Sequence, residues 1–374
     1  MQTYQTYIWQ NSDWPHFTYD LTKFHALLQE IRYQQGLLEG ISKGLSQEHL
    51  LEMQSETLAL DALTTSEIEG EILSRDSVRS SIFKKLGIAS EIQDRSTIQT
   101  DGLVDILLDA SGNASQPFDE DRLLGWHAAL FPTGYSGLHK INVASYRGDE
   151  PMQVVSGRIG KEKVHYVAPP HDRVEEEMQR FFDFLENPSD ENGYVRAAIA
   201  HLWFVIIHPM DDGNGRIARA LSDMMLSRIE NSSIRLYSMS AAINENRRGY
   251  YDVLEQTTTG AMDITAWIGW FLQIILTAQQ NAHAIIEKVG AKARFWQLHI
   301  HDDLNPRQKK VLNRLLDAGN EGFEGGINAR KYMSLCDCSR VTASRDLSDL
   351  LEKGFIVSRG AGGRSTSYDI DWIN

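Results

Sequence analysis

The sequence has few of the features that mark secreted, membrane-bound or disulfide-stabilised proteins. Only two of its 374 residues are cysteines, which excludes a disulfide framework or a four-cysteine zinc site and favours a reducing compartment. The most apolar run, about residues 266–278, is interrupted by Gln273 and is shorter than the roughly 20 residues that cross a bilayer. Residues 1–18 lack the basic and apolar regions of a signal peptide. We therefore predict a soluble, cytoplasmic protein with no membrane partner.

Positive charge is also scarce. The chain has 37 Lys and Arg against 51 Asp and Glu, a net charge of −14, which argues against a body-wide phosphate-binding surface. Residues 304–374 differ, because they hold 11 basic and 9 acidic residues (+2), which leaves −16 for the rest. With 42% hydrophobic and 24% charged residues the chain should fold, and its length suggests two or three domains. We expect one large body and a smaller, electrostatically separate C-terminal segment.

Hydrophobic spacing predicts a mainly α-helical protein. Residues 19–110 show helical spacing of Leu and Ile, and the nearly all-apolar stretch 197–207 predicts a buried helix. Two short β-prone pieces, 152–155 and 163–167, are separated by glycines and predict a hairpin on a helical body. The predicted domains are an N-terminal helical region (1–100), a core (101–290) and a C-terminal domain (300–374).

The C-terminal domain should contain three helices followed by a β-hairpin, an order that resembles a winged helix-turn-helix. We expect the third helix to bury four side chains, Val341, Leu347, Leu350 and Leu351. We expect it to present Arg340, Ser344 and Arg345 outward, as a recognition helix would. This domain is therefore predicted to contact DNA, or else to be an interaction or dimerisation module with a solvated polar face.

The segment His208-Pro-Met-Asp-Asp-Gly-Asn-Gly-Arg-Ile-Ala-Arg219 carries the chemistry. Pro209 cannot continue the preceding helix, and Gly213 and Gly215 permit a sharp turn whose N–H groups point inward. Because another helix should begin near Arg216, this loop is predicted to form an anion nest at a helix N-terminus.

The side chains of this segment suit phosphate chemistry. Arg216 and Arg219 are three residues apart, hence on one helical face, where both can bind one polyphosphate. Asp212 offers the hard oxygen ligand that phosphate-bound Mg²⁺ requires. His208 titrates near neutrality and is placed to take a proton from an attacking hydroxyl. The alternative is a plain Gly-Asn-Gly turn with two solvated arginines. Finding so many residues suited to phosphate chemistry within twelve positions argues against this alternative.

This segment resembles the signature of the Fic family, H-x-F-x-[DE]-G-N-[GK]-R-x-x-R. Met210 stands where the family usually has Phe, which implies a softer apolar plug beneath the loop. The resemblance implies an all-α bundle over about residues 100–280 with a β-hairpin flap, and transfer of AMP from ATP to a Ser, Thr or Tyr hydroxyl of a protein. Gly215 favours adenylylation, since phosphotransferases of the Doc type carry Lys there.

The stretch Thr65-Ser-Glu-Ile-Glu69-Gly70 is similar to the family's inhibitory motif, [ST]-x-x-x-E-[GN]. This resemblance implies that Glu69 pairs with Arg219, the arginine that otherwise holds the γ-phosphate. A carboxylate and a phosphate would compete for one guanidinium, so we expect autoinhibition in cis. The alternative interpretation of the stretch is an acidic helix start.

Two further parts of the site follow from the resemblance. Val154, Val155, Ser156 and Gly157 look like the flap that registers the target segment and covers the nucleotide, the alternative being an ordinary surface hairpin. Tyr250 and Tyr251 match the paired tyrosines that the family places near the adenine. Adjacent helical residues point about 100° apart, so one of the two should touch the base while the other packs in the core.

We therefore predict a Mg²⁺-dependent protein adenylyltransferase. His208 is the expected general base, Asp212 the metal ligand, and the backbone of Gly213, Asn214 and Gly215 with Arg216 the stabiliser of the α- and β-phosphates. The expected partners are ATP and a target protein of unknown identity, for which the chain itself is one candidate, and a homodimer is expected from the family. The rival hypotheses are removal of AMP with Glu69 orienting a water, transfer of another nucleotide or of phosphocholine, and a nucleotide-sensing DNA-binding regulator.

Overall fold

The computed structural model describes residues 7–88, 94–156, 163–318, 323, 325–359 and 366–371. The chain divides into two compact units, Met1–Ala282 and His283–Asn374. The N-terminal helical region and the core that were predicted separately thus share the first unit. In the part of the chain that the structure describes, every helix is too short or too polar to span a bilayer.

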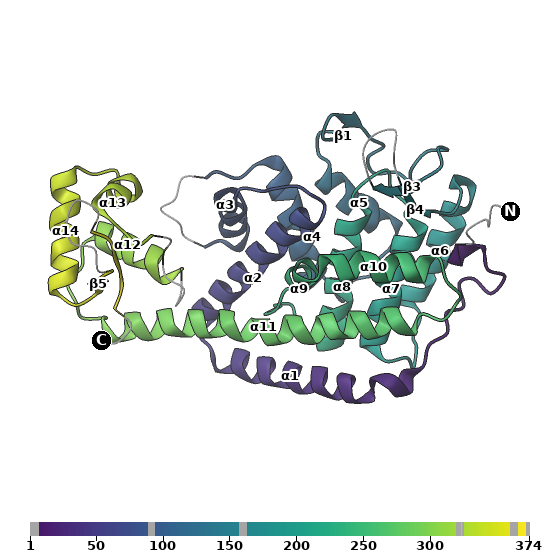
Figure 1. Cartoon of the computed structure of the whole chain (residues 1–374), viewed down its shortest axis with the longest axis horizontal. Coiled ribbons are helices and arrows are strands. Elements are labelled where there is room, and N and C mark those ends of the chain that lie inside the picture. Colours follow the sequence, from purple (N-terminus) through teal and green to yellow (C-terminus); the bar gives the residue numbers. More distant parts are fainter. Residues whose placement is uncertain are drawn as a thin grey trace. The chain divides into compact units, whose positions relative to one another are not determined.

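The first unit is mainly helical, as predicted (Figure 1). Its helices are α1 (His25–Gly44), α2 (Gln47–Ile68), α3 (Arg75–Leu86), α4 (Ile98–Gly112), α5 (Glu120–Leu130), α6 (Val174–Glu186), α7 (Gly193–Ile207), α8 (Asn214–Glu230), α9 (Met239–Glu245), α10 (Arg247–Thr258) and the first half of α11 (Thr265–Leu298). Short 3₁₀ helices lie at Ile8–Gln10, Leu21–Phe24 and His171–Arg173. Polar side chains cap several helix starts and satisfy N–H groups there, namely Ser46, Ser74, Thr97, Asp119, Asn192 and Ser238.

The core of this unit is built around α7. The helix is apolar on nearly all faces, and Leu202, Phe204 and Ile206 are fully buried, which confirms the buried helix predicted over 197–207. It packs against α6 and α8, and α8 in turn packs against α4 and α2. The C-terminal end of α7, the N-terminal end of α8 and the C-terminal end of α2 carry the candidate site.

Two small hairpins lie on the helical body. β1 (Tyr135–Ser136) pairs with β2 (His139–Lys140), and β3 (Gln153–Ser156) pairs antiparallel with β4 (Lys163–Val167), with a bulge between Val154 and Val155. Tyr166 on β4 is buried and donates its hydroxyl to the carbonyl of Ile206 at 2.8 Å. The predicted hairpin is therefore present and is attached to the end of α7.

The second unit holds the end of α11, then α12 (Pro306–Leu316), α13 (Ala329–Cys336), α14 (Arg340–Glu352), and the hairpin of β5 (Ile356–Ser358) and β6 (Tyr368–Ile370). Ile327 also bridges to Tyr368. This order of three helices and a hairpin is the one predicted. Contact with DNA or with a protein partner stays a prediction.

The predicted inward face of α14 was wrong at two positions. Val341 is 80% exposed and Leu351 is 41% exposed. The buried face is formed by Ala343, Asp346, Leu347 and Leu350, which repeat at helical spacing. Val341 lies two residues, about 200°, before Ala343 and thus opposite this face, and Leu351 lies about 100° beyond Leu350. Arg340, Ser344 and Arg345 are exposed, as expected.

Candidate active site

The signature segment forms a tight loop between two buried helices. Helix α7 ends at Ile207, and His208 adopts a left-handed conformation with φ 50°. Gly213 has φ 82°, and a Cβ atom there would lie 2.7 Å from the Leu130 side chain, so this position requires glycine. Helix α8 begins at Asn214, two residues earlier than predicted. The loop therefore delivers the free N–H groups of α8 to the site.

Asn214 holds the loop closed from inside. Its side-chain oxygen accepts the N–H of Met210 at 3.0 Å, and its nitrogen donates to the Met210 carbonyl at 2.9 Å. Met210 is fully buried, as expected for an apolar plug. Both polar atoms of the Asn214 side chain are thus bonded within the loop.

The ring of His208, the predicted general base, is held by one hydrogen bond. Its Nδ1 donates to the Val205 carbonyl at 3.2 Å, which leaves the lone pair of Nε2 unshared in the neutral ring. Burial lowers the pKa of His208 below its ordinary value of 6.5, an effect that the nearby Arg147 charge adds to. The ring is therefore neutral, and able to accept a proton, at neutral pH.

This pKa direction predicts a pH profile. If His208 is the general base of a transfer reaction, kcat/KM of a Glu69→Gly variant should be flat above about pH 7 and fall about tenfold per pH unit once the pH drops below the His208 pKa. The rate should fall on the acid side because a lowered pKa keeps His208 unprotonated down to a lower pH than an ordinary histidine. Initial rates from about pH 5 to about pH 9 test this, and an acid limb with its midpoint above 6.5 would contradict it.

Arg147 braces the loop and was not anticipated from the sequence. It is 1% exposed, its Nε donates to the His208 carbonyl at 2.8 Å, and its Nη2 donates to the Pro169 carbonyl. Its backbone N–H also donates to the Pro209 carbonyl at 2.9 Å. This buried arginine thus fixes the backbone at His208 and at the residue that follows it. No local spacing marks it, because an isolated arginine in a glycine-containing stretch resembles a surface residue.

Asp212, the predicted metal ligand, lies at the edge of the site. Its Oδ1 accepts the N–H of Gly213, and its Oδ2 accepts the hydroxyl of Ser136 from the β1–β2 hairpin. No group of three or more His, Cys, Asp or Glu among the described residues could hold a metal ion. A single carboxylate fits a Mg²⁺ ion whose other ligands are phosphate oxygens and waters.

The expected Glu69–Arg219 ion pair is present. Glu69 follows the last residue of α2, and its Oε1 accepts from Nη2 of Arg219 at 2.8 Å. Arg219 is 1% exposed and also donates to the hydroxyl and the carbonyl of Thr65, at 2.7 and 2.9 Å. A Cβ atom at Gly215 would lie 2.2 Å from Glu69 Oε1. The carboxylate therefore rests directly on the first turn of α8, where the nest was predicted.

One donor of this arginine has no partner. Nη1 of Arg219 is buried and makes no hydrogen bond, and it lies 3.2 Å from the Cβ position of Gly215. Nε of Arg216 is likewise buried and unpaired. Buried cationic donors without acceptors are costly, so the site has unused capacity for an anion beside Gly215.

Arg216 has its own acidic partner, which the sequence analysis missed. Its Nη1 donates to Oε2 of Glu71 at 2.8 Å, and its guanidinium stacks over the Phe131 ring at 5.1 Å. Glu71 lies two residues after Glu69, so one segment of the chain contacts both signature arginines. The alternating acidic residues Glu67, Glu69 and Glu71 could have indicated a second carboxylate facing the signature arginines.

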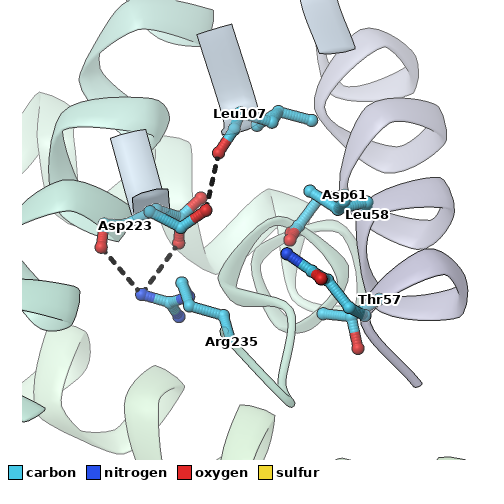
Figure 2. A pocket seen from close by; sticks show the side chains of 8 residues that line it. Thr57, Leu58, Asp61, Leu107, Asp223 and Arg235 are labelled. Carbon is cyan, nitrogen blue, oxygen red and sulfur yellow. Dashed lines mark hydrogen bonds and ion pairs between the residues drawn. The ribbon is translucent and has the colours of Figure 1, made fainter. Parts of the chain in front are cut away.

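A buried polar cluster lies between α2 and α8. Figure 2 shows Arg235 reaching both the carbonyl and the carboxylate of Asp223 on α8, at 3.1 and 3.2 Å, with Asp61 of α2 facing them. Asp61 also accepts the hydroxyl of Ser238. The cavity between these residues is about 10 Å³, room for about one water. Asp61 lies two turns before Glu69, so this cluster helps to set the position of the end of α2 that carries the Glu69 carboxylate.

The residues predicted to form the flap lie on β3, and the two predicted tyrosines differ in exposure. Val154 and Val155 lie on β3, with Val155 47% exposed, and Ser156 ends the strand, while Gly157 lies outside the described residues. Tyr251 is 42% exposed and donates its hydroxyl to the Ile68 carbonyl at 3.2 Å, beside Glu69. Tyr250 is 3% exposed and packs in the core. Contact with the adenine stays a prediction.

Comparison with known proteins assigns this loop to a family. A sequence profile of the Fic/DOC family matches residues 117–226, which include all of α7, the loop 208–213 and most of α8. The chain contains a Fic/DOC domain. A second profile, a domain of unknown function (DUF4172), matches residues 7–88. The residues that face the Fic arginines, Thr65, Glu69 and Glu71, thus come from outside the Fic domain itself.

Relatives of the Fic domain include named transferases. A uridine 5'-monophosphate transferase of Xanthomonas campestris pv. campestris is 26% identical over 126 residues, or 29% of this chain and 23% of that protein. The protein adenylyltransferase Fic of Nematostella vectensis is 32% identical over 97 residues, or 25% of this chain and 21% of that protein. The matches thus span less than a quarter of either relative's length.

The fold is shared with a solved Fic family protein. The crystal structure of one from Desulfovibrio desulfuricans has a TM-score of 0.54 at 20% identity, covering 92% of this chain and 95% of that chain. This likeness confirms the predicted helical fold with small hairpins.

Proposed function

We propose that this chain is a nucleotidyltransferase that transfers AMP from ATP to a hydroxyl group of a protein, and that Glu69 restrains it. The observation that carries the proposal is the carboxylate of Glu69 resting on Gly215 beside the unpaired Nη1 of Arg219. This place suits an anion, and a side chain of the same chain occupies it. The two relatives, a uridine 5'-monophosphate transferase and a protein adenylyltransferase, support nucleotidyl transfer.

The proposed step uses groups that the structure brings together. Nε2 of His208 takes the proton of the target hydroxyl, whose oxygen attacks the α-phosphorus. The bond to the β-phosphate bridging oxygen breaks, and pyrophosphate leaves. The N–H groups at the start of α8 and the guanidinium of Arg216 neutralise charge on the α- and β-phosphates, and Arg219 takes the γ-phosphate. Asp212 would hold a Mg²⁺ ion, which supplies further charge neutralisation when bound.

The first test compares wild type with Glu69→Gly, incubated with Mg²⁺ and ATP labelled at the α-phosphate. Label on protein should rise about 10- to 100-fold in the variant, since it loses one charge-assisted hydrogen bond that competes with phosphate. Glu67→Gly is the matched control. It removes a carboxylate from the same turn of α2, whose contact is Asn244 and not an arginine, and labelling should match wild type.

The alternatives give different outcomes. Label from UTP in place of ATP would assign UMP transfer. Release of AMP from a pre-modified protein by wild type, lost in Glu69→Gly, would assign the reverse reaction. Equal labelling by the Glu67 and Glu69 variants would remove the proposed restraint. A DNA-binding role for α14 would show as duplex binding that weakens with salt.

Glu71 should add a weaker restraint through Arg216. In a Glu69→Gly background, Glu71→Gln is expected to lower the KM for ATP about two- to fivefold, because its side chain is 46% exposed and an exposed ion pair contributes little. ATP titrations of the two variants measure this, with Glu67→Gln as control. A KM that stays the same would confine the restraint to Glu69.

A further inference from the structure

Strand β4 is fixed to three different parts of the first unit. Nδ1 of His165 lies 2.7 Å from Oε2 of Glu255 on α10. The buried Tyr166 bonds the end of α7 through its hydroxyl. The Val167 carbonyl accepts the indole N–H of Trp9 at 2.8 Å. Two of these contacts come from helices, and the third comes from the N-terminal segment of the chain.

The contact with Trp9 lies on the outer edge of β4. The Ala168 N–H donates to the Met152 carbonyl at 3.0 Å, and Gln153 lies opposite Val167. In an antiparallel ladder this makes Gln153 and Val167 a non-hydrogen-bonded pair, whose N–H and C=O groups point away from the partner strand. The Val167 carbonyl therefore points away from β3, and Trp9 supplies a donor that the sheet does not.

Trp9 is itself held by its neighbours. It lies in the 3₁₀ helix Ile8–Gln10, whose first residue is fully buried. The Arg173 guanidinium stacks over the Trp9 ring at 5.4 Å, and the ring of Tyr7 packs edge-on against that of Tyr166, with their centroids 5.3 Å apart. Residues 7–10 belong to the stretch that the DUF4172 profile matches. A region outside the Fic/DOC domain thus supports β4.

Strand β3, which carries the predicted flap residues, takes its position from β4. Within the described ranges the two form a two-stranded sheet, with Val154 opposite Tyr166. The chain just after β4 is also tied to the predicted base, since Arg147 donates both to the Pro169 carbonyl and to the His208 carbonyl. A shift of β4 would therefore change where β3 lies relative to His208.

We infer that Trp9 is a positioning residue, which sets the place of β4 and, through it, of the predicted flap strand β3 beside His208. The inference rests on the proposed function. Its consequence is that the N-terminal region acts on the site in two opposite ways, because Glu69 restrains transfer and Trp9 supports it. Loss of the Trp9 contact should therefore lower transfer even after Glu69 has been replaced. ATP binding should not change, because the groups assigned to the phosphates lie on α8 and the loop before it.

The test introduces Trp9→Phe into the Glu69→Gly protein. Phenylalanine keeps an aromatic ring for Arg173 but has no N–H for the Val167 carbonyl. Hydrogen exchange of the amides of residues 163–167, followed by mass spectrometry, should speed up about fivefold, since one hydrogen bond that opposes local opening is lost. Labelling of protein from ATP should fall about tenfold, because a small displacement of a positioning element has a large effect on the rate. The Kd for ATP should stay within about twofold of the parent, which corresponds to a negligible change in binding.

Trp296→Phe in the same background is the matched control. It removes an indole N–H of the same kind, donated to Asn313 in the second unit at 2.9 Å. Both the exchange of residues 163–167 and the labelling should match the Glu69→Gly parent. Melting temperatures show that each variant is folded.

Three results would overturn the inference and leave the proposed function in place. Unchanged exchange in Trp9→Phe would mean that Trp9 does not fix β4. Faster exchange with unchanged labelling would mean that β4 moves without consequence for transfer. Loss of ATP affinity in step with the rate would reduce Trp9 to a structural role. A Glu69→Gly parent that labels no protein from ATP or UTP overturns the proposed function and the positioning role with it, while the exchange result still decides whether Trp9 holds β4.

Discussion

Replacing His208 with alanine should lower the rate of AMP transfer by about 10²- to 10⁴-fold and leave ATP binding unchanged. The loss is the usual contribution of a positioned general base. Binding should persist because the groups assigned to the phosphates, Arg216, Arg219 and the start of α8, do not depend on the imidazole. The measurement is labelling from ATP in the Glu69→Gly background, with ATP affinity determined separately.

His208 has a left-handed backbone, which alanine adopts with some strain. His208→Asn is therefore the better-matched variant, since asparagine tolerates this conformation and cannot act as the base. Both variants should also lose the acid limb of the pH profile. Retention of near-full transfer by the Asn variant would remove the base assignment.

Replacing Arg147 with methionine should lower the free energy of unfolding by about 2–4 kcal/mol and cut transfer by at least tenfold. The substitution keeps an apolar stem of similar length but leaves the carbonyls of His208 and Pro169 buried without a donor, at about 1–3 kcal/mol for each unsatisfied group. Urea unfolding measures the stability, and labelling at a temperature where the variant is folded measures the rate.

The control is Arg180→Met, which removes an arginine from an exposed pair with Glu176 on α6. An exposed ion pair contributes little to the free energy of unfolding, so both the stability of this variant and its rate of transfer should stay near wild type. Full transfer by folded Arg147→Met would mean that Arg147 stabilises the fold without positioning His208.

The sequence predicted those parts of the site whose residues are neighbours in the chain. His208 to Arg219 lie in one run, so local spacing alone suggested a phosphate loop. Glu69 lies 150 residues before Arg219, and only the resemblance to a family motif connected them. Arg147 lies in the stretch before β3 and Ser136 on the two-residue strand β1, and their contacts depend on how these segments fold back onto the loop 208–213.

The fold was predicted in outline for the same reason. Apolar periodicity marked α7 and the order of helices in the second unit, since burial imposes that pattern directly. The exposed positions of Val341 and Leu351 show its limit. Both side chains are apolar, but their angle on the helix directs them away from the buried face. The buried face instead contains Asp346, an acidic residue that is paired with Arg307.

His208 and the Glu69 carboxylate are held by different parts of the chain. His208 is held by Arg147 and Val205, and the obstruction at Gly215 is held by the end of α2. Under the proposed function, His208 is therefore already held in place while the Glu69 carboxylate occupies the phosphate site. Under the proposed function, displacing the Glu69 carboxylate from Arg219 releases the main restraint, so the rate of activation would follow how often that ion pair breaks.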